Sequence, residues 1–131
     1  MFLGIDYGPK NIGLALSYGK IASPYKVLKA KNLILLIQKI KKICQSQKIE
    51  KIIIGLPEGI LAKETKKFAH LIKEKTSLPT TFVDETLTSQ ESLQKTLEAK
   101  IPLKKRKTLS HAFAATLILQ NYLDNNPRQT K

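Results

Sequence analysis

The sequence predicts an α/β fold built on one mixed β-sheet. Short apolar runs alternate along the chain with longer segments whose apolar residues recur every three or four positions. The expected order is three strands, a helix, a strand, a helix, a strand and two helices. Sequential strands tend to pair, and parallel strands need a helical crossover, so this order indicates a meander joined to βαβ units. A chain of 131 residues with 42% hydrophobic content can bury one core.

Three strands are expected at the beginning of the chain. The apolar runs Phe2–Asp6 and Ile12–Ser17 flank the turn-prone segment Tyr7–Asn11, which predicts a β-hairpin. Lys20–Leu28 is the third strand. Pro24 lies within it and predicts an irregularity or an edge position, because proline cannot donate a hydrogen bond to a neighbouring strand.

The middle of the chain alternates helices with buried strands. An amphipathic helix begins after Asn32, a plausible N-cap, and a second runs from about Leu61 to Thr76. Lys51–Pro57 is nearly all apolar and β-branched, which predicts a central strand covered on both faces. Pro79–Glu85 is a further short strand that ends in acidic residues.

Two helices are expected in the last third of the chain. Thr88 or Ser89 could cap a helix through about Leu97, and the last helix spans about Lys107 to Leu123. Between them, Ala99–Lys107 is interpreted as a basic connection whose charge predicts mobility. We expect one domain over residues 1–124 and a polar tail over residues 125–131.

The charge of the chain points to a polyanionic partner. The formal net charge is +13 and the isoelectric point is near 9.9, which attracts nucleic acid electrostatically. An anionic membrane would be attracted too, but no apolar run approaches the roughly 18 residues of a spanning helix, and the N-terminus lacks a signal-peptide pattern. We therefore expect a cytoplasmic protein without a membrane partner. Cys44, within the first helical pattern, is expected to be a buried structural thiol.

Acidic residues end two of the predicted strands. Asp6 closes the first strand and Asp84-Glu85 close the last, among only ten acidic residues in the chain. Such residues often cap a following turn or helix, so the interpretation as a site competes with a local structural one. Carboxylates on a basic binding face oppose phosphate binding unless a divalent cation lies between them. Oxygen ligands suit Mg²⁺ or Mn²⁺, which can activate water for phosphodiester hydrolysis.

Four segments, in order along nearly the whole chain, carry a family resemblance. They are GIDYGPKNIGLALS at residues 4–17, IIGLP at 53–57, FVDETLTS at 82–89 and AATLILQNYL at 114–123. Together they resemble the YqgF family of pre-ribosomal-RNA nucleases and Holliday-junction-resolvase-like proteins. The third segment departs from the family pattern, with Thr86 where arginine is usual.

The resemblance implies an RNase H-like fold, a five-stranded mixed sheet with helices on both faces. It also implies a cytoplasmic, metal-dependent endonuclease that processes the 5′ end of pre-16S rRNA, or alternatively cleaves branched DNA such as Holliday junctions. The family's catalytic, metal-binding acids fall on Asp6 and Glu85. Its third, an aspartate that opens the last helix, falls on His111 in the segment HAFAA. Imidazole can bind a metal but favours Mn²⁺ over Mg²⁺. A lone histidine on a helix is more often structural, and His70, which matches no motif, is interpreted that way.

Several residues are candidates for contacts with nucleic acid: Lys10, Thr88, Ser89, Lys104, Lys105, Arg106 and Lys107. The basic residues could clamp phosphates or form a solvated surface, and the hydroxyl residues could contact phosphate or cap a helix. Tyr7 could stack on a base or shield the turn.

Two other functions fit parts of the sequence. The Asp-x-Gly turn also resembles the phosphate loop of actin-like ATPases, although those proteins close two lobes around the nucleotide and this chain is long enough for one. The replacement of the third aspartate by His111 also fits a binding protein that has lost its activity. The sequence decides neither between RNA and DNA nor between monomer and dimer.

Overall fold

The computed structural model describes residues 1–84 and 103–126. A single five-stranded sheet has the order β3-β2-β1-β4-β5. Its strands are β1 (Phe2–Tyr7), β2 (Asn11–Tyr18), β3 (Ile21–Lys29), β4 (Lys51–Leu56) and β5 (Thr80–Asp84). The first three form an antiparallel meander, and β4 and β5 continue the sheet in parallel with β1. The predicted mixed sheet is confirmed, and β4 lies inside it with Ile52–Gly55 buried.

The third strand has both features that its proline predicted. It lies at the edge of the sheet, and its register with β2 shifts between Leu14, which pairs with Lys26, and Ala15, which pairs with Pro24. Because proline has no N–H to donate, an edge position beside an irregularity is where a strand tolerates it.

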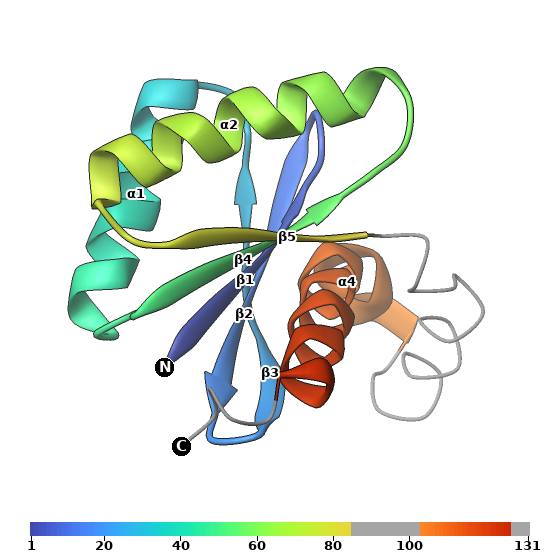
Figure 1. Cartoon of the computed structure of the whole chain (residues 1–131). Helices are drawn as coiled ribbons and strands as arrows, with labels where there is room; N and C mark the ends of the chain where they lie inside the picture. The colour runs from blue at the N-terminus through green and yellow to red at the C-terminus, as the bar shows by residue number, and fades with distance from the viewer. Residues whose placement is uncertain (85–102, 127–131) are drawn as a thin grey trace.

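One face of the sheet is covered by two helices, α1 (Leu33–Ser46) and α2 (Ile60–Thr76) (Figure 1). Alternate residues of β1 and β2 pack there with apolar residues of both helices, as the period of two in a strand requires. The fully buried side chains on this face are large: Leu3, Ile5, Ile12, Leu14, Leu16, Ile40, Ile52, Ile54, Phe68 and Ile72. Asn32 caps α1 as predicted, accepting a hydrogen bond from the N–H of Leu35 at 3.2 Å. Cys44 is buried in this core, and burial raises the pKa of its thiol to about 11.

The opposite face is covered by α4 (Leu103–Asn125), which crosses β1, β2 and β3 (Figure 1). Small residues let this helix approach the strands closely. A Cβ on Gly4 would lie 2.7 Å from the Cβ of Leu119, and a Cβ on Gly13 would overlap the carbonyl group of His111 and lie 2.6 Å from the N of Ala112. Two glycines therefore fix how close α4 can lie to the sheet.

Polar contacts hold the far end of α4 against the strands. The side-chain oxygen of Gln120 accepts from the N–H of Ala22 at 2.8 Å, and its side-chain nitrogen donates to the carbonyl of Lys20 at 3.0 Å. Lys51 at the start of β4 donates to the hydroxyl of Tyr122 at 2.6 Å. These contacts tie α4 to β3 and to β4.

The start of α4 differs from the prediction. The helix begins at Leu103, four residues before the expected start at Lys107, so the expectation of a non-helical basic connection is wrong for residues 103–106. Lysine and arginine are good helix formers, and a charged turn can be helical without contributing to the apolar period from which the boundary was drawn. The helix expected from Thr88 or Ser89 to Leu97 lies outside the described residues and stays a prediction. None of the helices in the described ranges is both long and apolar enough to cross a membrane.

Candidate active site

The sheet places Asp6 at the carboxyl end of β1, on the face that α4 covers. Phe2 packs in the core beneath α4 and Gly4 lies against Leu119, so the alternation of the strand directs Asp6 to the same face. Asp6 pairs with Gly13 on β2. Its side chain is 16% exposed, so the carboxylate is largely enclosed but open at the edge of the sheet.

Helix α4 brings His111 to this carboxylate. Ala112 and Ala115 are fully buried against the sheet, and the close contact of the helix backbone with Gly13 sets His111 beside β1 and β2. The Nδ1 atom of His111 lies 3.4 Å from the Oδ2 atom of Asp6, across 105 residues of sequence. The imidazole is 36% exposed. An acid and a histidine from opposite ends of the chain thus meet in one partly open site.

The carboxylate changes the acid–base behaviour of the imidazole. The hydrogen bond that the ring N–H donates to Asp6, together with the negative charge of Asp6, raises the pKa of His111 above the ordinary value of 6.5, while burial opposes the change. The proton shared by the pair is therefore bound more firmly than by a histidine in water.

The other predicted acid follows the end of β5 in the sequence. Leu56 of β4 pairs with Asp84 of β5, and Ile5 of β1 pairs with Ile54 of β4, so the three parallel strands end at the same edge of the sheet. Glu85 comes directly after β5 and lies outside the described residues. Within residues 1–84 and 103–126 there is no group of three or more His, Cys, Asp or Glu side chains that could hold a metal. Of the three predicted site residues, Asp6 and His111 are the two that the described part of the chain brings together.

This pair lies in a chain whose sequence matches a family of nucleases. Residues 1–125 match the model of the family described as "RuvX: Holliday junction resolvase". The chain belongs to this family. Similar curated proteins named "Putative pre-16S rRNA nuclease" include one from Syntrophomonas wolfei, 38% identical over 93% of this chain and 92% of its own length. Another, from Protochlamydia amoebophila, is 37% identical over 94% of this chain and 92% of its own length. The resemblance noted in the sequence is confirmed.

Solved structures of resolvases share the fold of this RuvX-family chain. RuvC of T. thermophilus in complex with a Holliday junction substrate superposes with a TM-score of 0.66, covering 99% of this chain and 97% of RuvC at 13% identity. The Fowlpox virus resolvase in complex with Holliday junction DNA gives a TM-score of 0.64, covering 95% of this chain and 97% of the viral chain at 12% identity. At such low identity the likeness shows the fold alone, and it confirms the expected RNase H-like architecture.

The remaining predicted residues of this RuvX-family chain fall in different places. Lys10 is exposed in the turn between β1 and β2, on the edge where Asp6 lies. Residues 104–107 belong to the first turns of α4, whereas Thr88 and Ser89 lie outside the described residues. The ring of Tyr7 packs on Phe68, with centroids 4.7 Å apart, so it belongs to the core on the face opposite Asp6. Burial and the nearby Glu64 raise the pKa of its phenol. His70 is exposed on α2.

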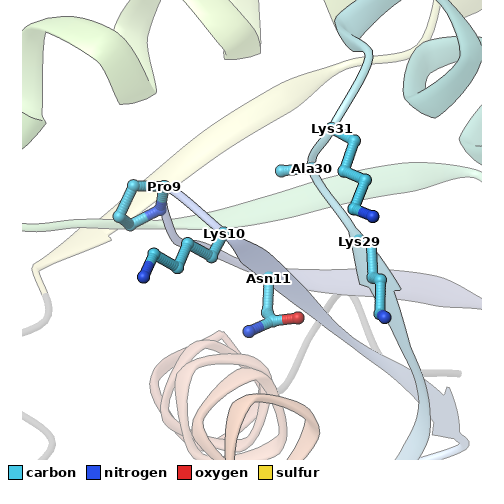
Figure 2. Close-up of a pocket in the computed structure, with 6 residues that line it drawn as sticks. All are labelled: Pro9, Lys10, Asn11, Lys29, Ala30 and Lys31. Carbon is cyan, nitrogen blue, oxygen red and sulfur yellow. The ribbon is translucent and has the colours of Figure 1, made fainter.

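Two lysines that the sequence analysis did not single out complete a basic cavity at this edge. The cavity has a volume of about 410 Å³ and is lined by Pro9, Lys10, Asn11, Lys29, Ala30 and Lys31 (Figure 2). The N–H of Ala30 donates to the carbonyl of Lys10 at 2.9 Å, which joins the end of β3 to the hairpin turn. In the sequence, the cavity was indicated only by Lys29 and Lys31, which flank Ala30 directly after the predicted third strand.

Proposed function

We propose that this chain is a metal-dependent endonuclease that hydrolyses phosphodiester bonds in structured nucleic acid. The observation that carries the proposal is the pairing of Asp6 with His111 at 3.4 Å, at the edge of the sheet where three parallel strands end. The family match over residues 1–125 supports it. So does the net charge of +13, because a basic chain has a strong electrostatic attraction to phosphate backbones.

The donor set at the site fits a divalent cation. Asp6 offers a carboxylate oxygen and His111 offers a ring nitrogen, and both are partly exposed and directed toward each other. We propose Glu85 as the third ligand, because it directly follows the strand that ends beside this edge. Mixed oxygen and nitrogen donors favour Mn²⁺ over Mg²⁺. When bound, such an ion supplies charge stabilisation at the phosphate and activation of water.

The protein side chains have roles of their own. The carboxylate of Asp6 orients the imidazole of His111, and the backbone contact at Gly13 limits the movement of both. The proton held between them must be released before the neutral imidazole of His111 can bind a metal ion. Lys10, in the adjacent turn, attracts the phosphate backbone toward the edge. We also propose that Lys104, Lys105, Arg106 and Lys107 contact phosphates of the substrate. Thr88 and Ser89 are proposed to contact the nucleic-acid backbone.

The favoured substrate is pre-16S rRNA, because relatives at 37–38% identity are named "Putative pre-16S rRNA nuclease". We propose its 5′ end, as the family resemblance of the sequence implies. Branched DNA is the second candidate, favoured by the description of the family model. A cytoplasmic location accords with either substrate.

A single cleavage assay tests the activity and the choice of substrate. The purified protein is incubated with a pre-16S rRNA 5′ fragment and with a four-way DNA junction, in Mn²⁺ or Mg²⁺, beside the Asp6→Asn and Glu85→Gln variants. Each variant should lose cleavage by at least about 100-fold yet bind as tightly or more tightly, because each removes a negative charge from a phosphate site. Glu74→Gln, an exposed acid on α2, is the matched control and should cleave like the parent.

Equal cleavage by the parent and both site variants would refute the proposed active site. Binding of both substrates without cleavage in either metal would instead favour a non-catalytic binding protein.

A further inference from the structure

The basic cavity at the end of β3 lies on the same edge of the sheet as Asp6 and His111. Asn11 of β2 pairs with Lys29 of β3, and Gly13, two residues further along β2, pairs with Asp6 of β1. Asn11, Gly13 and Asp6 therefore share one face by strand alternation, and the pairing assigns Lys29 to that face as well. The cavity adjoins the candidate active site on the side away from β5.

The lining of the cavity is suited to an anion. Three of its six residues are lysines, and none of these six is acidic. Lys10, Lys29 and Lys31 are exposed, so their ammonium groups can reach a ligand that enters from solvent. Figure 2 shows Asn11 pointing toward α4, with the amino groups of Lys10 and Lys29 on either side of its amide in this view. An amide N–H among ammonium groups can donate hydrogen bonds to phosphate oxygens, as the lysines do.

The backbone fixes two walls of the cavity relative to each other. The hydrogen bond from the N–H of Ala30 to the carbonyl of Lys10 closes the sheet at the point where Lys29 and Lys31 leave it. Lys10 belongs to the hairpin turn that directly follows β1, the strand that carries Asp6. The position of the cavity relative to the reactive edge is therefore set by the hairpin.

We propose that this cavity binds a backbone phosphate of the substrate strand a few nucleotides from the bond that is cleaved, with Lys29 and Lys31 as its specific contacts. The proposal rests on the proposed nuclease function for the identity of the strand. Two strand spacings of ~4.8 Å across the sheet, and an offset of two residues at ~3.4 Å each along it, separate Asp6 from Lys29, so the phosphate would lie roughly 12 Å from Asp6. At ~3.4 Å of rise per nucleotide along one strand, that is about three to four nucleotides.

The first experiment measures binding without cleavage. Affinity for a fluorescent four-way DNA junction, and for an RNA hairpin of matched length, is measured in EDTA over a series of salt concentrations. In Lys29→Gln/Lys31→Gln, the slope of log K against log salt should fall by about 1.8, because each lost phosphate contact on duplex DNA contributes ~0.9. If the two proteins bind equally at 1 M salt, that change makes the variant bind roughly 60-fold more weakly than the parent at 0.1 M salt.

The control removes the same charge elsewhere. Lys41 and Lys42 are exposed near the C-terminal end of α1, so Lys41→Gln/Lys42→Gln changes the net charge equally without altering the cavity. It should keep the parental slope. An equal decrease of the salt slope in both double variants would overturn the proposal. It would show that Lys29 and Lys31 contribute to binding no more than other surface lysines do.

The second experiment locates the phosphate. Single neutral methylphosphonate linkages are placed one to five nucleotides on each side of the cleaved bond, and binding is measured for each oligonucleotide. One position about three to four nucleotides away should weaken binding by the parent and leave Lys29→Gln/Lys31→Gln unaffected. An equal loss of affinity at every position would overturn the proposal. So would complete competition by free inorganic phosphate without any effect of position.

The two proposals fail separately. If the parent cleaves in Mn²⁺ but the cavity variant binds like its control, the cavity assignment is wrong and the nuclease stands. If no substrate is cleaved but Lys29→Gln/Lys31→Gln lowers the salt slope and its control does not, the cavity still binds a backbone phosphate and the nuclease proposal fails.

Discussion

The two faces of the sheet are packed in different ways. Against α1 and α2 the strands present large aliphatic side chains such as Ile5 and Leu14, all fully buried. Against α4, β1 and β2 present Gly4, Gly13 and Ala15, so the backbone of the helix comes close to the backbone of the sheet. Large side chains can shift to absorb small changes, whereas backbone in contact with backbone cannot. The first face therefore mainly stabilises the fold, and the second also sets the position of His111.

Neighbouring residues of β2 can test this contrast. Gly13→Ala places a methyl group where the carbonyl of His111 lies, so α4 must move away from the sheet. We expect a loss of about 3 kcal/mol in the free energy of unfolding, at the upper end of the usual range for overpacking. Cleavage by the folded protein should fall by about 100-fold or more, because displacements of about 1 Å have effects of that size. Circular dichroism in urea and a cleavage assay below the melting transition measure the two quantities.

Leu14→Ala is the matched change on the other face. It should also lower the free energy of unfolding by about 3 kcal/mol, because buried apolar surface is lost and a cavity is left. Cleavage per folded molecule should stay within about threefold of the parent. If both variants lose cleavage equally, the distinction between the two faces is wrong.

A smaller effect is expected from His111 itself, on the helix side of the contrast. His111→Ala should raise the concentration of Mn²⁺ needed for half-maximal cleavage by about 10-fold or more, because it removes one of the proposed donors. His111→Asp should shift the preference of the site from Mn²⁺ toward Mg²⁺, since a carboxylate is the ligand that Mg²⁺ prefers. Metal titrations of cleavage measure both, with His70→Ala as the matched control. Unchanged titrations for His111→Ala would make this histidine a bystander.

The smallest effect concerns the proton between Asp6 and His111 in metal-free protein. NMR titration in EDTA should give a pKa for His111 above 6.5, and Asp6→Asn should lower it, because the hydrogen bond to Asp6 is the main cause of the increase. A raised pKa in the folded state stabilises the protein below the unfolded pKa, and this contribution is lost as pH rises through the folded pKa. The parent should therefore exceed Asp6→Asn in unfolding free energy more at pH ~5.5 than at pH ~8.5, by at most about 1 kcal/mol because the imidazole is partly exposed to solvent. A pKa that is the same in both proteins would show that the contact is absent in solution.

The sequence predicted the strands well because their signal is local. Alternation and β-branched runs locate β1, β2 and β4, and Pro24 indicated the edge and the irregularity of β3. The beginning of α4 was misplaced because charged residues contribute nothing to an apolar period. Asp6 and His111 were paired through motif alignment alone, since no local pattern reports a contact across 105 residues.

The basic cavity could not have been predicted in the same way. It exists because the N–H of Ala30 bonds to the carbonyl of Lys10, which brings the ends of β2 and β3 together. Lys29 and Lys31 look like ordinary surface lysines until that register is known. Gly13 shows the same limit, because its lack of a side chain matters only once α4 lies across it.

Gln120 lies far from the candidate active site on the same helix as His111. It lies nine residues beyond His111 on α4, roughly 14 Å along the helix axis. Its hydrogen bonds with Ala22 and Lys20 join α4 to the sheet and oppose movement of the helix along the strands. Because a helix is nearly rigid, a movement of α4 along its axis at one end displaces the other end by almost the same distance. We therefore expect the amide of Gln120, at the other end of the strands, to influence the distance between His111 and Asp6 although it contacts neither residue.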